Sequence, residues 1–269
     1  MNIIGAYFSP TGTTKKITWT VAEAIHQSLK ESIISRRDFT LPQARQAPLE
    51  FLVGDIVVLG MPVYAGRVPN LLLPYLSSLA GSGAIGLPIA VYGNRHFDYA
   101  LIELSDMMKQ AGLRVIGGGA FIGEHSFSKV LAKDRPDDND LAIARRFGEA
   151  IAEKIRRNDL SHVKLPGDEN DQAYYQPKAQ AGDPIDIRPV KPVTDKVRCI
   201  DCRLCAKRCP LGSIDFEDVS KTPGICMKCG SCIKGCPTQA KFFNDPGYLY
   251  HKTNLEETYT ARKEPVYFL

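Results

Sequence analysis

Eight cysteines, all that the chain contains, lie in two short runs with the same spacing. The first run is Cys199, Cys202, Cys205 and Cys209, and each returns 27 positions later as Cys226, Cys229, Cys232 and Cys236. A proline follows the last cysteine of each run. Three thiolates at three-residue intervals can wrap one face of an iron–sulfur cubane and leave one iron for a fourth ligand. The spacing therefore predicts two [4Fe–4S] clusters.

Disulfides and zinc are the alternative uses of so many cysteines. The chain opens with MNIIGAYFSP, which has no basic leader, and no apolar stretch is long enough to cross a bilayer. We therefore expect a cytoplasmic protein without a membrane span, and reducing cytosol disfavours structural disulfides. Zinc sites usually pair two C-x2-C units across a longer spacer. The spacing favours iron–sulfur over both alternatives.

The stretch from Val197 to Phe243 resembles the bacterial two-[4Fe–4S] ferredoxins, which are small α+β domains. In such ferredoxins the fourth cysteine of each run binds the other cluster. The resemblance implies that one cluster takes Cys199, Cys202, Cys205 and Cys236, and that the second takes Cys226, Cys229, Cys232 and Cys209.

Alternating strand and helix patterns cover residues 1–160, which precede the cysteine runs. Apolar runs predict strands at 2–8, 55–60, 87–94 and 114–123. Helical patterns lie at 69–79, at 98–112 with Gly112 as its cap, at 137–157, and where Ile17, Val21, Ile25 and Leu29 recur every four residues. Repeated strand–helix units predict a doubly wound α/β domain with a five-stranded parallel sheet.

The rest of the chain divides into three parts. Residues 161–195 are rich in proline, glycine and charge, which predicts a linker that Tyr174, Tyr175 and Ile185 could pin to a surface. The cysteine module occupies 196–243. The tail, 244–269, is rich in aromatic residues and is expected to pack back on the body of the protein.

The loop after the first predicted strand carries hydroxyl groups and a glycine in front of a helix. These residues are Ser9, Thr11, Gly12, Thr13 and Thr14. The free N–H groups and the dipole of the following helix favour an anion such as a phosphate, although a plain serine or threonine N-cap would use the same residue types. The loop resembles the [ST]-x-T-G-x-T phosphate loop of flavodoxins, which implies a flavodoxin-like fold and FMN as a cofactor.

Two further loops follow the predicted strands at 55–60 and 87–94. Family resemblance implies that they hold the flavin ring through Pro62, Val63, Tyr64, Ala65 and Gly66 in one loop and Gly93, Asn94, Arg95 and Phe97 in the other. Tyr64 could lie against a ring face or could be an ordinary core or surface tyrosine. Glu124 and His125, after the last strand of this domain, could reach the flavin or serve only their own loop.

Taken whole, the chain resembles the flavodoxin–ferredoxin fusion proteins of anaerobic bacteria and archaea. The resemblance implies an iron–sulfur flavoprotein that moves electrons between FMN, two clusters and a partner protein. The alternative is an FMN-dependent reductase, with Arg67, Arg95 and His125 around a small molecule. A third reading makes the clusters structural. No nucleophile or acid–base arrangement decides whether the protein is an enzyme.

Charge gives the one indication of a partner. Residues 196–243 hold nine basic and four acidic side chains, a difference of +5, whereas the whole chain carries +4. We therefore expect an acidic redox partner protein to dock on the cysteine module, assisted by Lys207, Arg208 and Lys228. Nucleic acid is not expected, because the pattern offers neither a binding fold nor an aromatic platform.

Overall fold

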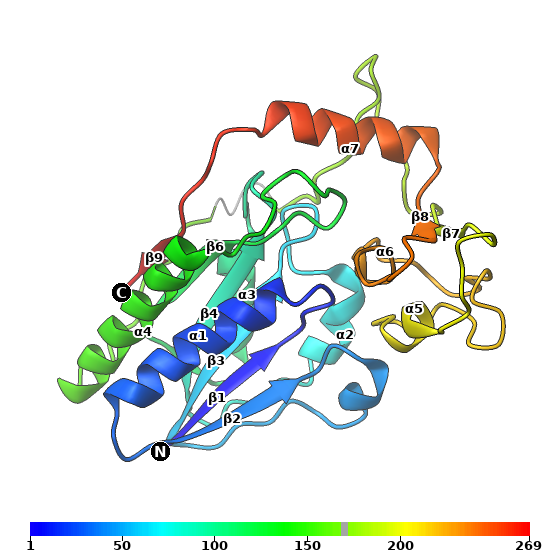
Figure 1. Cartoon of the computed structure of the whole chain (residues 1–269). Helices are drawn as coiled ribbons and strands as arrows, with labels where there is room; N and C mark the ends of the chain where they lie inside the picture. Colours follow the sequence, from blue (N-terminus) through cyan, green and yellow to red (C-terminus); the bar gives the residue numbers. More distant parts are fainter. Residues whose placement is uncertain (168–171) are drawn as a thin grey trace.

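The computed structural model describes residues 1–167 and 172–269 (Figure 1). The linker prediction over 161–195 falls partly on residues 168–171, which lie outside the described residues. The strands are β1 Asn2–Tyr7, β2 Ile33–Asp38, β3 Asp55–Pro62, β4 Ile85–Tyr92, β5 Arg114–Val115, β6 Gly118–Ile122, β7 Val193–Thr194, β8 Lys241–Phe242 and β9 Val266–Phe268. The helices are α1 Thr13–Ser28, α2 Leu73–Leu76, α3 Ala100–Gln110, α4 Asp138–Arg156, α5 Leu204–Lys207, α6 Ser231–Lys234 and α7 Pro246–Thr258, with 3₁₀ turns η1 Pro42–Arg45 and η2 Asn70–Leu72.

The large sheet has the strand order β2-β1-β3-β4-β6-β9, and β5 pairs with β4. All pairs among β1 to β6 are parallel. The order 2-1-3-4 followed by the last parallel strand is that of a doubly wound, flavodoxin-like α/β fold. In such a sheet the carboxyl ends of β1 and β3 meet at the topological switch point, where ligands bind.

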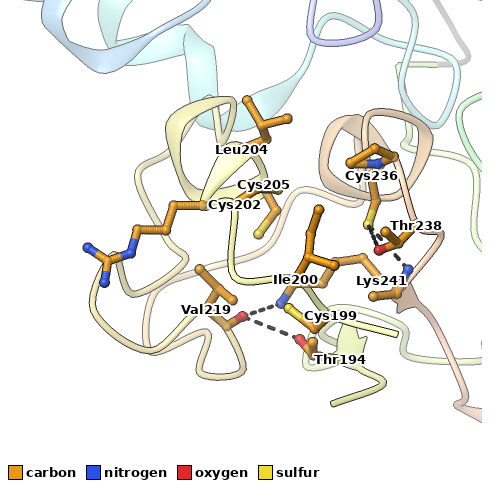
Figure 2. A pocket seen from close by; sticks show the side chains of 13 residues that line it. Thr194, Cys199, Ile200, Cys202, Leu204, Cys205, Val219, Cys236, Thr238 and Lys241 are labelled. Atoms are coloured by element: carbon orange, nitrogen blue, oxygen red, sulfur yellow. Dashed lines mark hydrogen bonds between the residues drawn. The ribbon is translucent and has the colours of Figure 1, made fainter. Parts of the chain in front are cut away.

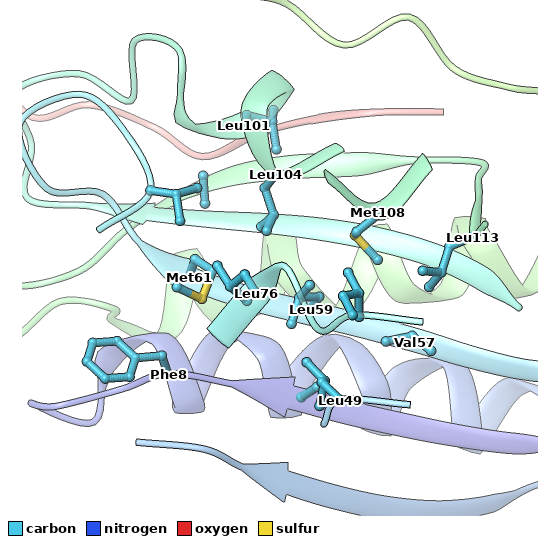
Figure 3. Close-up of a cluster of buried hydrophobic side chains, with 14 of the residues drawn as sticks. Phe8, Leu49, Val57, Leu59, Met61, Leu76, Leu101, Leu104, Met108 and Leu113 are labelled. Carbon is cyan, nitrogen blue, oxygen red and sulfur yellow. The ribbon is translucent and has the colours of Figure 1, made fainter. Parts of the chain in front are cut away.

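Helices cover both faces of this sheet, so its inner strands are buried on both sides, whereas the edge strand β2 is largely exposed. On one face α1 and α4 pack against the strands around Ile17, Val21, Phe147 and Ile151. On the other face α3 and the short α2 cover a second cluster, which includes Leu59, Leu101 and Met108 (Figure 3). Every residue of β3 is buried, which explains its continuous apolar run.

The structure differs from the predicted elements in three places. The stretch 69–79 forms only η2 and the single turn α2, because a proline in the stretch interrupts the helical hydrogen bonds. The predicted strand at 114–123 is broken into β5 and β6, both of which pair with β4. In the described residues the sheet has seven strands rather than the expected five. The split into β5 and β6 adds one strand, and the C-terminal β9 adds another at the edge of β6 in the antiparallel direction.

The cysteine module repeats its backbone as well as its sequence. The one-turn helices α5 and α6 each begin two residues after the second cysteine of a run, which is Cys202 in the first run and Cys229 in the second. The residues that flank this second cysteine have positive φ in both runs: Asp201 and Arg203 in the first, Lys228 and Gly230 in the second. The short strands β7 and β8 pair antiparallel and close the module.

The linker and the tail both lie against the flavodoxin-like domain. The Tyr175 N–H donates to the Ala65 carbonyl (2.9 Å), and the Tyr174 hydroxyl donates to the Val68 carbonyl (3.1 Å). Helix α7 leads from the cysteine module back across the molecule to β9 (Figure 1). Of the helices in the described residues, none is both long enough and apolar enough to span a bilayer.

Candidate functional site

The loop after β1 leaves the start of α1 open to an anion. Gly12 occupies the N-cap position with φ of 91°, and no side chain caps the helix. The Ser9 hydroxyl instead accepts from the Lys15 N–H (2.9 Å), one turn into the helix. A Cβ placed on Gly12 would meet no atom within 4 Å. The space beside Gly12 at the start of α1 is therefore open, as a phosphate site requires, although the Lys15 N–H is already bonded to Ser9.

A cavity of about 410 Å³ lies beside this loop and is bordered by charged side chains. Lys16, Arg135 and Lys234 supply positive charge, while Glu124 and Asp134 supply negative charge. The volume falls within the ~300–1,000 Å³ typical of small-molecule pockets. Arg135 is paired with Asp140, and Lys234 is paired with Glu124. The N-terminus of α1 together with the Lys16 ammonium fits an anion such as a phosphate.

A smaller cavity of about 50 Å³ adjoins the first, since Thr11, Thr13 and Glu124 line both. The loops after β1, β3, β4 and β6 enclose it at the carboxyl ends of the strands. Of the predicted cofactor contacts it is lined by Thr11, Thr13, Thr14, Pro62, Val63, Tyr64 and Gly93. The three loops that the sequence singled out therefore meet at one place.

Ala65 and Gly66 do not line either cavity that adjoins the loop. They form a tight turn in which Tyr64 and Arg67 exchange backbone hydrogen bonds of 2.9 and 3.1 Å. Both turn residues have positive φ, 50° and 80°, which is the geometry of a two-residue hairpin loop. Their role is to fix the position of Tyr64.

Asn94, Arg95 and Phe97 line neither cavity, and their expected ring contacts stay a prediction. The buried Asn94 amide donates to the Tyr259 and Ala261 carbonyls (2.7 and 2.9 Å), and its oxygen accepts from a backbone N–H of the tail. Arg95 pairs with Asp98 and lies over the Tyr175 ring. The Phe97 ring packs against Tyr92 and His96, with centroid distances of 5.7 and 4.8 Å. These side chains hold the tail, the linker and the core.

His125 lines the small cavity. The sequence leaves open whether this side chain could reach the flavin or would serve only its own loop. Its Nδ1 accepts from the Phe127 N–H (3.1 Å), so the proton of the neutral ring resides on Nε2. Burial, followed by the positive charge of Lys234, lowers the pKa of His125 to about 3. The imidazole is therefore neutral at physiological pH. Tyr92 also lines the cavity. In the sequence, only its place at the end of a strand could have indicated this role.

The eight thiols gather around two further cavities, four at each. Cys199, Cys202, Cys205 and Cys236 line the first (Figure 2). Cys209, Cys226, Cys229 and Cys232 line the second. Each run therefore contributes three thiols to one cavity and its fourth to the other. This is the grouping that the resemblance to two-cluster ferredoxins implies, and four thiols are what one [4Fe–4S] cluster needs.

All eight cysteines are free thiols. Within residues 1–167 and 172–269, no group of three or more His, Cys, Asp or Glu side chains could hold a metal ion by itself. A four-iron cluster makes a different demand, because each of its thiolates binds a different iron. Burial raises the pKa of Cys232 to about 12, so without a bound metal this thiol keeps its proton near neutral pH.

Two backbone N–H groups donate to sulfur at equivalent positions of the repeat. The Ser213 N–H donates to Cys209 Sγ (3.3 Å), and the Ala240 N–H donates to Cys236 Sγ (3.2 Å). Each donor lies four residues after its cysteine, and each cysteine is the last of its run. Hydrogen bonds of this kind stabilise a thiolate and tune the potential of a cluster.

Two buried lysines accompany the cysteine sets. Lys228 is 8 % exposed and donates to the Cys226 carbonyl (2.8 Å) and the Arg188 carbonyl. Lys241 is 2 % exposed and donates to the Val219 carbonyl. In the described part of the chain neither forms an ion pair with a carboxylate. Buried cations need compensating negative charge, which a cluster with four thiolates would supply. Lys228 therefore cannot assist docking at the surface.

The module meets the flavodoxin-like domain at the small cavity. The Lys234 ammonium forms an ion pair with Glu124 and donates to the His125 carbonyl (2.7 Å). A side chain on Gly230 would collide with the Ser126 carbonyl, so the backbones touch at this point. Burial, and then the negative charge of Cys229, raises the pKa of Tyr64 well above its usual range. The second cysteine set thus lies next to the small cavity.

No family model matches the chain. No curated protein matches it either. Among solved structures, it is similar to a flavodoxin from the domain Archaea, with 19% identity over 58% of this chain and 99% of that chain and a TM-score of 0.40. A flavodoxin of Streptococcus pneumoniae TIGR4 shares 15% identity over 57% and 99%, with a TM-score of 0.39. The azoreductase AzrA shares 10% over 57% and 100%, with a TM-score of 0.35.

The role of Asn94 in holding the tail is testable. Asn94→Ala removes three hydrogen bonds to residues 259–263, and we expect it to cost about 1–3 kcal/mol and to speed amide hydrogen exchange from residue 259 onwards. Asn254→Ala, at an exposed position on α7, is the control. Equal exchange protection in the two variants would show that the tail does not depend on Asn94.

Proposed function

We propose that this chain is an electron-transfer protein that holds FMN at the carboxyl ends of its parallel strands and two [4Fe–4S] clusters in its cysteine module. It exchanges electrons with a redox partner protein. The observation that carries the proposal is the division of eight thiols between two cavities, four at each, with one set beside the phosphate loop's cavities. When bound, FMN takes one or two electrons and each cluster takes one, so the protein would join single-electron to pair transfer.

The cysteines are proposed to ligate across the two runs. One site uses Cys199, Cys202, Cys205 and Cys236, and the other uses Cys226, Cys229, Cys232 and Cys209. The buried ammonium groups of Lys228 and Lys241 offset the negative charge of the thiolates. These fixed cations would favour the reduced, more negative state of each site, whereas the exclusion of water by burial would oppose it.

The FMN phosphate is proposed to bind the N–H groups of Thr13 and Thr14, with Lys16 and Arg135 nearby. The Gly12 N–H donates to the Ser9 carbonyl instead (3.3 Å). Tyr64 and His125 border the adjoining cavity and would contact the ring. The neutral His125 offers an Nε2–H donor and carries no charge of its own that would shift with pH near neutrality.

The reductase alternative is not favoured by the geometry. Arg67 forms a buried ion pair with Glu103 and a cation–π contact with Tyr174, and Arg95 pairs with Asp98. Only His125 of the three residues expected around a small molecule lines the small cavity. The Lys234–Glu124 contact also brings the cysteine module over this opening.

Gly12→Val tests the phosphate site. The new side chain would project into the space that the phosphate is proposed to fill, and we expect purified protein to lose most of its FMN. Gly54→Val is a matched control, because Gly54 has nearly the same φ, 88° against 91°, and equally open surroundings away from the site. Flavin content after gentle purification is the measurement. FMN retained in full by Gly12→Val would place the phosphate elsewhere.

Crossed ligation can be tested by counting iron. Cys209→Ser should cost one cluster, and combining it with Cys226→Ser should cost no more, because both residues serve the same proposed site. Combining Cys209→Ser with Cys199→Ser should cost both clusters. Iron and acid-labile sulfide are measured on protein reconstituted without oxygen. The crossed assignment would be contradicted if the Cys209→Ser and Cys199→Ser pair cost only one cluster and the Cys209→Ser and Cys226→Ser pair cost both.

A further inference from the structure

The two cysteine sets differ in what covers them. The second set is enclosed on the side of the flavodoxin-like domain: Cys229 is buried, Gly230 touches Ser126, and Met227 packs against the sheet's core. In the first set Cys202 is exposed and its three companions are half-buried. The first set is thus the one near solvent.

Exposed apolar side chains surround the first set. Ile200 and Leu204, which line its cavity, are 65 % and 39 % exposed (Figure 2). Val197, two residues before Cys199, is 96 % exposed, and Phe216 is 45 % exposed. Apolar groups gathered at the surface next to a functional site mark an interaction surface. We call these four residues the apolar face.

The charged side chains around the apolar face are mostly basic, and some of them form no ion pair within the described residues. Residues 196–208 hold five basic side chains and one acidic side chain. Arg198 and Arg203 pair with acids of the module itself, whereas Lys196 and Lys207 are exposed and form no ion pair in the described residues. Lys207 lies 6.0 Å from the centre of the Phe216 ring, which places positive charge at the edge of the apolar face.

The basic side chains of the second run are all engaged. Lys228 is buried against backbone carbonyls, Lys234 pairs with Glu124, and Lys221 pairs with Asp218 at 3.3 Å. Within the described residues, exposed basic side chains without an ion pair therefore lie on the first cysteine run and not on the second. Electrostatic complementarity steers a charged partner toward such a patch.

We propose that the apolar face over the first cysteine set is the docking site of an acidic protein that carries one electron at a time. This inference rests on the proposed function, because it takes the first set as a cluster site. The partner's carboxylates meet Lys196 and Lys207, and its apolar surface meets Ile200 and Leu204. The second set, covered by the flavodoxin-like domain, is the flavin-side site.

The chain offers a matched pair of variants for the test. Ile200 and Ile225 are both 65 % exposed, and each lines the cavity of one cysteine set. Ile200→Glu places a negative charge in the docking face, whereas Ile225→Glu places it beside the other set. An acidic bacterial ferredoxin serves as the probe, and its dissociation constant is measured at low ionic strength.

We expect Ile200→Glu to weaken binding about tenfold or more, and Ile225→Glu to change it less than about twofold. The affinity of the unaltered protein should fall steeply as salt is added. Equal weakening by both variants, or a larger effect of Ile225→Glu, would overturn the proposal. So would a failure of the probe to bind the unaltered protein at low salt.

Cross-linking locates the contact without any variant. A carbodiimide should join carboxylates of the probe to Lys196 or Lys207, and cross-links confined to lysines of the flavodoxin-like domain would contradict the docking face. Iron, sulfide and FMN are assayed on the same samples. Missing cofactors would count against the proposed function, whereas full cofactor content with binding at another face would count against the docking site alone.

Discussion

The contact of Lys234 with Glu124 and the His125 carbonyl joins the two halves of this protein at the point where their chemistry would meet. On one side is a loop at the carboxyl end of β6, and on the other is helix α6, which contains Cys232 and ends at Lys234. Were the cysteine module attached only through its linker, its distance from the phosphate loop would vary. The contact instead fixes the second cysteine set beside Tyr64, and everything proposed about electron exchange depends on that proximity.

Two buried lysines near the cysteines would cost less free energy to bury if each cysteine site held its proposed cluster. Lys228 and Lys241 are buried without a carboxylate partner in the described residues, and burial raises the pKa of Cys226 and Cys229. The buried cations would offset the negative charge of thiolate ligands around a bound cluster, and binding of the cluster would have to displace the protons of these thiols. The same reasoning places the free cations, Lys196 and Lys207, at the surface where a partner can reach them.

Local patterns made much of this architecture predictable. The spacing of the cysteines, the strand–helix alternation and the loop from Ser9 to Thr14 depend on neighbours in sequence, and the structure gathers these residues where the patterns indicate. The contacts of Asn94 could not be predicted, because its hydrogen-bond partners lie in a tail more than 160 residues away. Phe97 packs on Tyr92, only five residues before it, but no local pattern shows which way its ring points. The strand β9 and the burial of Lys228 likewise arise from contacts that no local pattern reveals.

The central claim is that the module and the sheet domain form one electron path within a single molecule. Anaerobic rapid mixing of oxidised protein with a one-electron reductant, following flavin and iron–sulfur absorbance separately, tests it most directly. The account predicts that the flavin becomes reduced after the clusters, at a rate independent of protein concentration and without any small-molecule substrate. Clusters that stay reduced beside an oxidised flavin, or a flavin rate that rises with protein concentration, would contradict it.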